Sequence, residues 1–293
     1  MIRRVRVVDS GVMGAIETCN FDLHCHSTIS DGTLAPAGIV RRAAANGVSV
    51  LALTDHDELA GLAAAADAAR ADGIRFVAGV EISVTWAETT IHIVGLGIDP
   101  ANAELDARLQ HLRASRGRRA ERIAAEFDGL GIPGTLEGAY GYAENPKLIG
   151  RAHFARFLAD IGVARDVSSV FRHYLVRGKP GYVPQQWAEL AEAVAWIRAS
   201  GGRAVVAHPG RYKFSRDQLR QFLVEFKAAG GEGIEVVTGS HSPDQYVEFA
   251  RLAREFDLLA SRGSDFHGPD ESHIDLGRLP QLPADLKPVW HDW

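Results

Sequence analysis

The sequence has few cysteines and no long apolar run. Its 293 residues include only Cys19 and Cys25, which are far too few for a disulfide framework. No apolar stretch approaches the roughly 20 residues that a membrane-spanning helix needs, and the basic N-terminus Met1–Val8 has too short an apolar part for a signal peptide. We therefore expect a cytoplasmic protein without membrane contact or an obligate protein partner, in which residues 1–18 form a loosely attached tail.

Charge is distributed unevenly along the chain, whose formal net charge is −5. Residues 100–185 contain 13 Lys or Arg and 9 Asp or Glu, a balance of +4, whereas the remaining residues contain 19 and 28, a balance of −9. A cationic segment of this kind fits either a solvated helix surface or a lid that attracts an anion. Charge alone does not choose between the two.

Short apolar runs that indicate strands alternate with Ala-rich helical patterns. The strand-like runs lie near residues 19–23, 48–53, 74–80, 90–96, 203–207, 233–237 and 258–262. The helical patterns between them lie at 36–46, 58–72, 187–200, 215–229 and 243–256. This alternation predicts an α/β protein built from parallel βα units, with a seven-stranded barrel.

The alternation breaks between residues 97 and 202, where the patterns are helical: about 101–129, 146–160 and 165–176. We therefore predict a discontinuous barrel domain, residues 19–99 and 186–293, with an inserted helical lid at 100–185. Insertions that follow the carboxyl end of a barrel strand lie over the face that carries the active site.

Most of the strand-like runs contain or end on a histidine or a carboxylate. The nine candidate metal ligands found in this way are His24, His26, Asp31, His56, Glu81, His92, His208, Asp265 and His267. Imidazole and carboxylate without thiolate suit manganese, iron or zinc, and six histidines with three carboxylates exceed what one ion can use. We predict two or three divalent transition-metal ions, against the alternative that these histidines are hydrogen-bonded core residues.

Closely spaced metal ions generate a hydroxide at neutral pH and bind both oxygens of an in-line displacement, which favours phosphoester hydrolysis. Amide hydrolysis by metal-binding barrels is a competitor that often uses a carbamylated lysine. None of the chain's lysines ends a predicted strand. Cys25 should point away from His24 and His26, because side chains alternate along a strand, and we interpret it as a core thiol.

At this point the residues resemble the PHP (polymerase and histidinol phosphatase) family of the amidohydrolase superfamily. The matching motifs, in chain order, are Asp22-x-His24-x-His26, Thr54-Asp55-His56-Asp57, Gly79-Val80-Glu81, Ala207-His208-Pro209 and Gly263-Ser264-Asp265-x-His267. The resemblance implies a distorted (β/α)7 barrel with a trinuclear metal centre.

The resemblance also implies which residues bind each metal ion. One ion would be bound by His24, His26, Glu81 and Asp265, a second by Asp31, His56 and His267, and a third by Glu81, His92 and His208. Asp31 stands where many members have histidine, which favours a harder ion such as Mn²⁺ over Zn²⁺ or Fe²⁺. Asp22, Asp55 and Asp57 are expected to support the ligands or cap helices.

The chain looks most like the stand-alone subgroup with a helical insertion. That subgroup includes 3′,5′-nucleoside bisphosphate phosphatases, which release the 3′-phosphate, and 5′-to-3′ oligoribonucleotide exonucleases. The resemblance implies a small phosphorylated nucleotide as substrate, attacked by a metal-bridging hydroxide, with short single-stranded RNA as a second possible substrate. A histidinol-phosphate phosphatase would share the barrel and the metal ions, and a degenerate barrel could serve as a binding or regulatory module without catalysis.

Several residues outside the metal motifs are candidates for substrate contacts. His241, in a loop that opens a helix, is predicted to bind phosphate or to protonate the leaving group, and Asp265 is counted with the catalytic residues. Arg211 lies on the same rim, while Arg151 and Lys179 flank helical patterns of the insertion. For Arg151, phosphate binding competes with an exposed position at a helix start.

Overall fold

The computed structural model describes residues 19–293, and the predicted tail at 1–18 lies outside this range. In the described residues one eight-stranded sheet has the order β1-β2-β3-β4-β6-β7-β8, with β5 paired to β3. The strands are β1 (Phe21–Asp22), β2 (Val50–Leu53), β3 (Arg75–Trp86), β4 (Thr89–Leu96), β5 (Ala188–Glu189), β6 (Arg203–Val206), β7 (Gly233–Thr238) and β8 (Leu259–Gly263).

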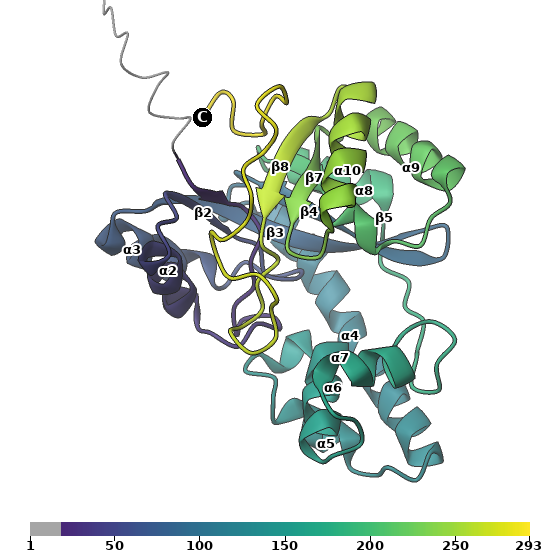
Figure 1. Ribbon diagram of the computed structural model, residues 1–293. Coiled ribbons are helices and arrows are strands. Elements are labelled where there is room, and N and C mark those ends of the chain that lie inside the picture. Colours follow the sequence, from purple (N-terminus) through teal and green to yellow (C-terminus); the bar gives the residue numbers. More distant parts are fainter. Residues whose placement is uncertain (1–18) are drawn as a thin grey trace, which may run out of the picture.

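Helices cover the outer face of this sheet (Figure 1). They are α2 (Pro36–Ala45), α3 (Leu62–Asp72), α8 (Leu190–Ala199), α9 (Arg216–Ala228) and α10 (Pro243–Glu255). Ser215 and Ser242 start α9 and α10 with capping boxes, in which a serine and a glutamine three residues later satisfy each other's backbone N–H groups. None of the described helices is both long enough and apolar enough to cross a membrane.

Hydrogen bonds between the first and last strands nearly close the sheet into a barrel. The backbone N–H of Leu23 donates to the Arg262 carbonyl at 3.0 Å, and that of Asp265 donates to the His24 carbonyl at 2.8 Å. Arg262 is fully buried and donates to the Phe21 carbonyl at 2.7 Å. The carboxyl ends of β1 and β8, which carry several predicted ligands, are thereby fixed next to each other.

The predicted pattern of parallel βα units does not extend to β4. This strand pairs antiparallel with both β3 and β6. β3 continues to Trp86 and returns through Ala87 and Glu88, whose φ angles of 44° and 59° are those of a tight hairpin turn. Neither residue is a glycine or an asparagine, so the sequence carries no ordinary signal for this turn.

Between β4 and β5 the chain is helical, and in Figure 1 this segment lies below the barrel. Its elements are α4 (Ala103–Gly129), α5 (Thr135–Tyr140), η1 (Pro146–Leu148), α6 (Arg151–Asp160), α7 (Val167–Val170) and the π-helical turn η2 (Phe171–Leu175). These helices surround a hydrophobic cluster of their own, which includes Phe127, Phe154 and Leu158. A separate core is what the predicted domain division requires, and the boundaries at 100 and 185 stay a prediction.

Replacing Phe154 with alanine tests whether this helical core is energetically separate. Phe154 is fully buried, so its loss should cost about 3–5 kcal/mol and should speed hydrogen exchange in α4–α6 more than in the barrel strands. Ile161, which is 49% exposed, provides the control, because Ile161→Ala should change stability by less than about 0.5 kcal/mol. Uniform acceleration of exchange across the barrel would contradict a separate core.

Candidate metal centre

All nine predicted metal ligands meet at one end of the barrel. They form four overlapping groups. Within each group, one donor atom from every residue lies within 4.8 Å of the others. Members of these groups come from β3, from β4 and from the segments that follow β1, β2, β6 and β8. The groups are His26, Asp31, His56 and His267; His24, Glu81 and His208; His24, His26 and Asp265; and His56, Glu81 and His92.

Glu81 is the centre of this arrangement. Its carboxylate is fully buried, and one oxygen, Oε1, lies 2.9 Å from both His92 Nδ1 and His208 Nε2. The other oxygen, Oε2, lies 2.9 Å from His56 Nδ1 and 3.2 Å from His26 Nε2. A single carboxylate therefore touches imidazoles from four segments of the chain.

Two more carboxylates complete the cluster. Asp265 Oδ1 lies 3.3 Å from His26 Nε2 and 3.5 Å from His24 Nε2. Asp31 lies 3.5 Å from His267 Nε2 and 3.8 Å from the nearest nitrogen of His26. These gaps are longer than ordinary hydrogen bonds, although all of the atoms face a common space.

Two of the candidate ligands adopt backbone conformations that L-residues rarely adopt. His208 has φ 28° and Asp265 has φ 56°. Such conformations cost on the order of 1–3 kcal/mol each and, outside turns such as the one at Ala87 and Glu88, they cluster at functional sites. Here they turn the two side chains into the cluster at the points where β6 and β8 end.

The electrostatics and the unsatisfied atoms of the cluster fit divalent metal ions. Burial alone would raise the pKa of Glu81, but His92, His56 and His24 keep that pKa well below its usual range. In the described part of the chain, buried Glu81 Oε2, His56 Nδ1 and Asp265 Oδ1 make no hydrogen bond of acceptable geometry. Buried polar atoms are normally paired, so converging unpaired oxygen and nitrogen atoms indicate cation ligands.

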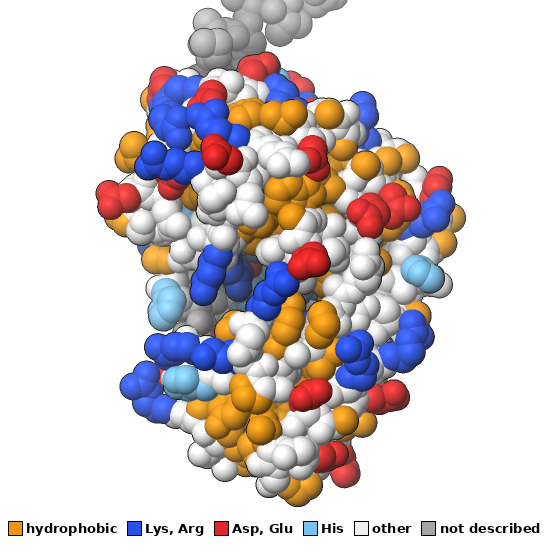
Figure 2. All heavy atoms as spheres, turned by 90° about the vertical axis from the view of Figure 1, so that its right-hand side faces the viewer, with side chains coloured by type: hydrophobic (Ala, Val, Ile, Leu, Met, Phe, Trp, Pro, Cys, Tyr) orange, Lys and Arg blue, Asp and Glu red, His pale blue; other side chains and the backbone are white. Residues whose placement is uncertain are grey.

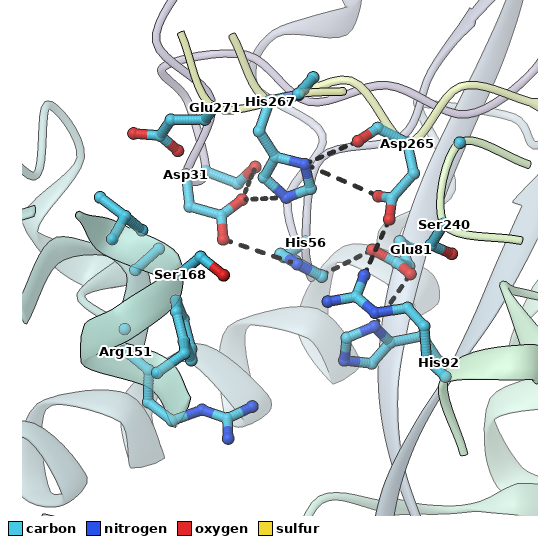
Figure 3. A pocket seen from close by; sticks show the side chains of 18 of the residues that line it. Asp31, His56, Glu81, His92, Arg151, Ser168, Ser240, Asp265, His267 and Glu271 are labelled. Atoms are coloured by element: carbon cyan, nitrogen blue, oxygen red, sulfur yellow. Dashed lines mark hydrogen bonds and ion pairs between the residues drawn. The ribbon is translucent and has the colours of Figure 1, made fainter. Parts of the chain in front are cut away.

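Six members of the cluster line a cavity of about 860 Å³ between the barrel and the helical segment: Asp31, His56, Glu81, His92, Asp265 and His267. Figure 2 shows Lys and Arg side chains around a hollow that separates the barrel, at the top, from the helices. In Figure 3, Arg151 and Ser168 reach the cavity from the helical side, opposite His92 and Asp265. The arginines that line the cavity are Arg116, Arg119, Arg151 and Arg211.

Comparison with protein families shows to which family this barrel belongs. The model of the PHP domain matches residues 22–238, which include the candidate ligands from His24 to His208. The chain belongs to the PHP domain family. The seven-stranded order, with an added short strand β5, is thus a PHP barrel.

Two relatives match this PHP chain over nearly their whole length. A 3′,5′-nucleoside bisphosphate phosphatase of Chromobacterium violaceum is 50% identical, covering 93% of this chain and 96% of the relative. A 5′-3′ exoribonuclease of Haemophilus influenzae is 44% identical, covering 93% and 98%.

Solved structures agree with the fold of this PHP chain. An amidohydrolase from Chromobacterium violaceum, with bound sulfate and no metal, superposes with a TM-score of 0.90 at 50% identity and covers 93% of this chain and 95% of its own. A candidate metal-dependent phosphoesterase from Bifidobacterium adolescentis has a TM-score of 0.78 at 28% identity, with 94% of each chain covered.

The predicted substrate residues divide into two groups. Arg151 and Arg211 line the cavity, and Arg211 also pairs with Asp265 at 2.8 Å. Lys179 is exposed and lies outside the cavity lining. The geometry therefore gives no support to the predicted phosphate contact of Lys179.

The prediction for His241 needs correction. One ring nitrogen accepts from the Gly210 N–H at 2.9 Å, and the other donates to the Val236 carbonyl at 3.2 Å. Its ring stacks on Phe249, and burial lowers the pKa of His241 to about 4. Both nitrogens are thus used to connect the loop after β6 to β7, and neither is left to bind phosphate or to protonate a leaving group.

The carboxylates expected to support the ligands are buried and bind loop backbone. Asp22 accepts from the N–H groups of Ser264 and Gly277, both at 2.8 Å. Asp55 accepts from the N–H and the hydroxyl of Ser27, both at 2.7 Å. These contacts fix the loops that carry Asp265, His26 and Asp31, and neither carboxylate caps a helix.

Glu235, the buried glutamate of β7, was not predicted from the sequence. One of its oxygens lies 2.7 Å from His24 Nδ1, and the other accepts from the His208 N–H. The sequence feature that could have indicated Glu235 is a lone carboxylate within the apolar run Gly233–Thr238. Carboxylates in this position orient a metal-binding imidazole and increase its basicity.

Glu235→Gln should weaken divalent metal binding by about 10–100-fold. Glutamine can replace only one of the two carboxylate oxygens that face His24 Nδ1 and the His208 N–H, and its NH2 group would face the other donor. Competition with a chromogenic chelator measures the affinity. The exposed Glu248 on α10 provides a matched control, because Glu248→Gln should leave the affinity unchanged. Equal affinities for the two variants would rule out this positioning role.

Proposed function

We propose that this PHP chain is a metal-dependent phosphatase that releases the 3′-phosphate from nucleoside 3′,5′-bisphosphates to give the 5′-monophosphate. The observation that carries the proposal is the convergence of nine candidate ligands, six of which line an arginine-lined cavity. The relative that is 50% identical is named for this activity. A binding module with a degenerate barrel would have no need of a complete ligand set.

The proposed centre binds two or three divalent ions, with Mn²⁺ favoured over Zn²⁺ or Fe²⁺ because Asp31 is a hard oxygen ligand. The proposed ligand sets are His24, His26, Glu81 and Asp265; Asp31, His56 and His267; and Glu81, His92 and His208. When bound, ions in these positions lower the pKa of water and neutralise the charge of the phosphate.

The protein's own residues orient the substrate. The Arg151 guanidinium extends into the cavity opposite the ligand cluster (Figure 3), so a substrate with two phosphates can reach both sides. Arg211, which is paired with Asp265, positions that carboxylate at the edge of the cluster. A positively charged wall favours a polyanion over histidinol phosphate, which carries its own ammonium group.

Hydrolysis of short oligoribonucleotides is the second candidate function. It is supported by the relative named as a 5′-3′ exoribonuclease and by the cavity, whose hollow at the surface (Figure 2) gives room for a chain beyond one nucleotide. Both functions use the same ligand cluster and differ in whether a phosphomonoester or a phosphodiester is cut.

The substrate test compares adenosine 3′,5′-bisphosphate with histidinol phosphate and a 5′-phosphorylated diribonucleotide, using Mn²⁺-loaded protein. We expect release of inorganic phosphate from the bisphosphate, and phosphorus NMR should show that the 5′-monoester survives. His56→Ala should lower the rate by at least ~100-fold, while the exposed His111→Ala should not change it. Preferential hydrolysis of histidinol phosphate, or cleavage of the 5′-ester, would contradict the proposal.

A further inference from the structure

Two of the cavity's arginines form no ion pair with the carboxylates of residues 19–293. Arg116 pairs with Asp57, and Arg211 pairs with Asp265. Arg119 and Arg151, by contrast, form no ion pair with any residue in the described range 19–293. Each of these two side chains donates one hydrogen bond to a backbone carbonyl: Arg119 to Val183 at 3.0 Å and Arg151 to Leu175 at 3.1 Å.

Arg119 is buried as well as unpaired, with 7% of its surface exposed. Its guanidinium lies over the ring of Trp187, 5.6 Å from the centroid, and Arg116 lies over the same ring at 4.8 Å. Burial lowers the pKa of Arg119 to about 9, and the positive charges of Arg151 and Arg116 add to that effect. A buried cation without a counter-ion is unfavourable, and still more so beside other cations.

Arg151 shares the same surroundings. It lies over the Phe171 ring at 5.8 Å. Burial, together with the charges of Arg211 and Arg116, lowers its pKa against the opposing effects of Tyr182 and Asp31. It is the first residue of the ten-residue helix α6, whose amino end also lines the cavity with Gly150 and Ala152. The positive end of a helix dipole at this place adds to the attraction for an anion.

We infer that Arg119 and Arg151 form the subsite for the phosphate that is not cleaved. This inference rests on the proposed function and identifies the residues that would distinguish a bisphosphate from a monoester. The bound dianion would supply the missing counter-charge through charge-assisted hydrogen bonds from both guanidinium groups. The sequence predicted a phosphate contact for Arg151 but not for Arg119. Lys179, for which it also predicted one, lies outside the cavity lining.

The kinetic test replaces Arg119 with methionine, which keeps most of the side-chain length without the charge. Arg122→Met, at an exposed position of the same helix α4, is the matched control. For adenosine 3′,5′-bisphosphate, kcat/KM should fall roughly 10- to 150-fold in Arg119→Met, as for loss of a hydrogen bond to a charged group. For p-nitrophenyl phosphate, which lacks the second phosphate, the rate should stay within about twofold, since no transition-state contact is lost.

A binding test with adenosine 5′-monophosphate separates a subsite from a structural role. This product keeps the second phosphate, so it should raise the Tm of wild type and of Arg122→Met, and should raise that of Arg119→Met little or not at all. Without nucleotide, Arg119→Met should be as stable as wild type or more stable, because it removes an uncompensated buried cation. Arg151→Ala should lose the same nucleotide effect.

Three results would overturn the inference. They are equal losses on both phosphate esters, an unchanged nucleotide-dependent rise in Tm in Arg119→Met, and a lower Tm of that variant without nucleotide. If wild type instead releases no phosphate from the bisphosphate, the proposed function fails. The Tm comparison with adenosine 5′-monophosphate still decides whether the arginine pair binds a phosphate.

Discussion

The buried carboxylate of Glu81 imposes the constraint on which the rest of this structure depends. It is fully buried in the middle of β3, with nitrogen atoms of His26, His56, His92 and His208 within 3.2 Å. A carboxylate so far from water is stable only when a cation or hydrogen-bond donors compensate its charge. Several features place histidines around this carboxylate. The strands bring the histidines together, His208 and Asp265 have left-handed backbone, and Glu235 accepts from the His208 N–H.

A second set of ionic contacts attaches the helical segment to the barrel. Arg116 of α4 bonds to Asp57, next to the candidate ligand His56, and Arg156 of α6 pairs with Glu271 at 2.6 Å. Arg156 also donates to the Asp31 carbonyl. These arginines are neutralised by the barrel, so the positive charge that remains in the cavity comes from Arg119 and Arg151. Part of the positive charge of residues 100–185 thus attaches the segment to the barrel, and part faces the cavity, where we propose that it binds phosphate.

The sequence predicted much of the fold and site because the relevant residues follow regular patterns. Strand-like runs that contain, end on or lie beside a histidine or carboxylate pointed to all nine members of the cluster, and the motifs pointed to the PHP family. The antiparallel β4 was missed because Ala87 and Glu88 form a turn that glycine or asparagine would normally signal. The hydrogen-bonded position of His241 was missed because a histidine in a loop has the same sequence signature whether its ring faces a cavity or backbone. Glu235 and Arg119 required the tertiary structure, since nothing local shows what they contact.

The most direct test of a multinuclear centre is to locate metal ions in crystals grown with Mn²⁺, using anomalous diffraction on both sides of the manganese absorption edge. We expect at least two manganese peaks beside Glu81, with Asp31 and Asp265 each at one of them. Fully active crystals with a single peak, or with no peak at the Glu81 carboxylate, would contradict a multinuclear centre built on this residue.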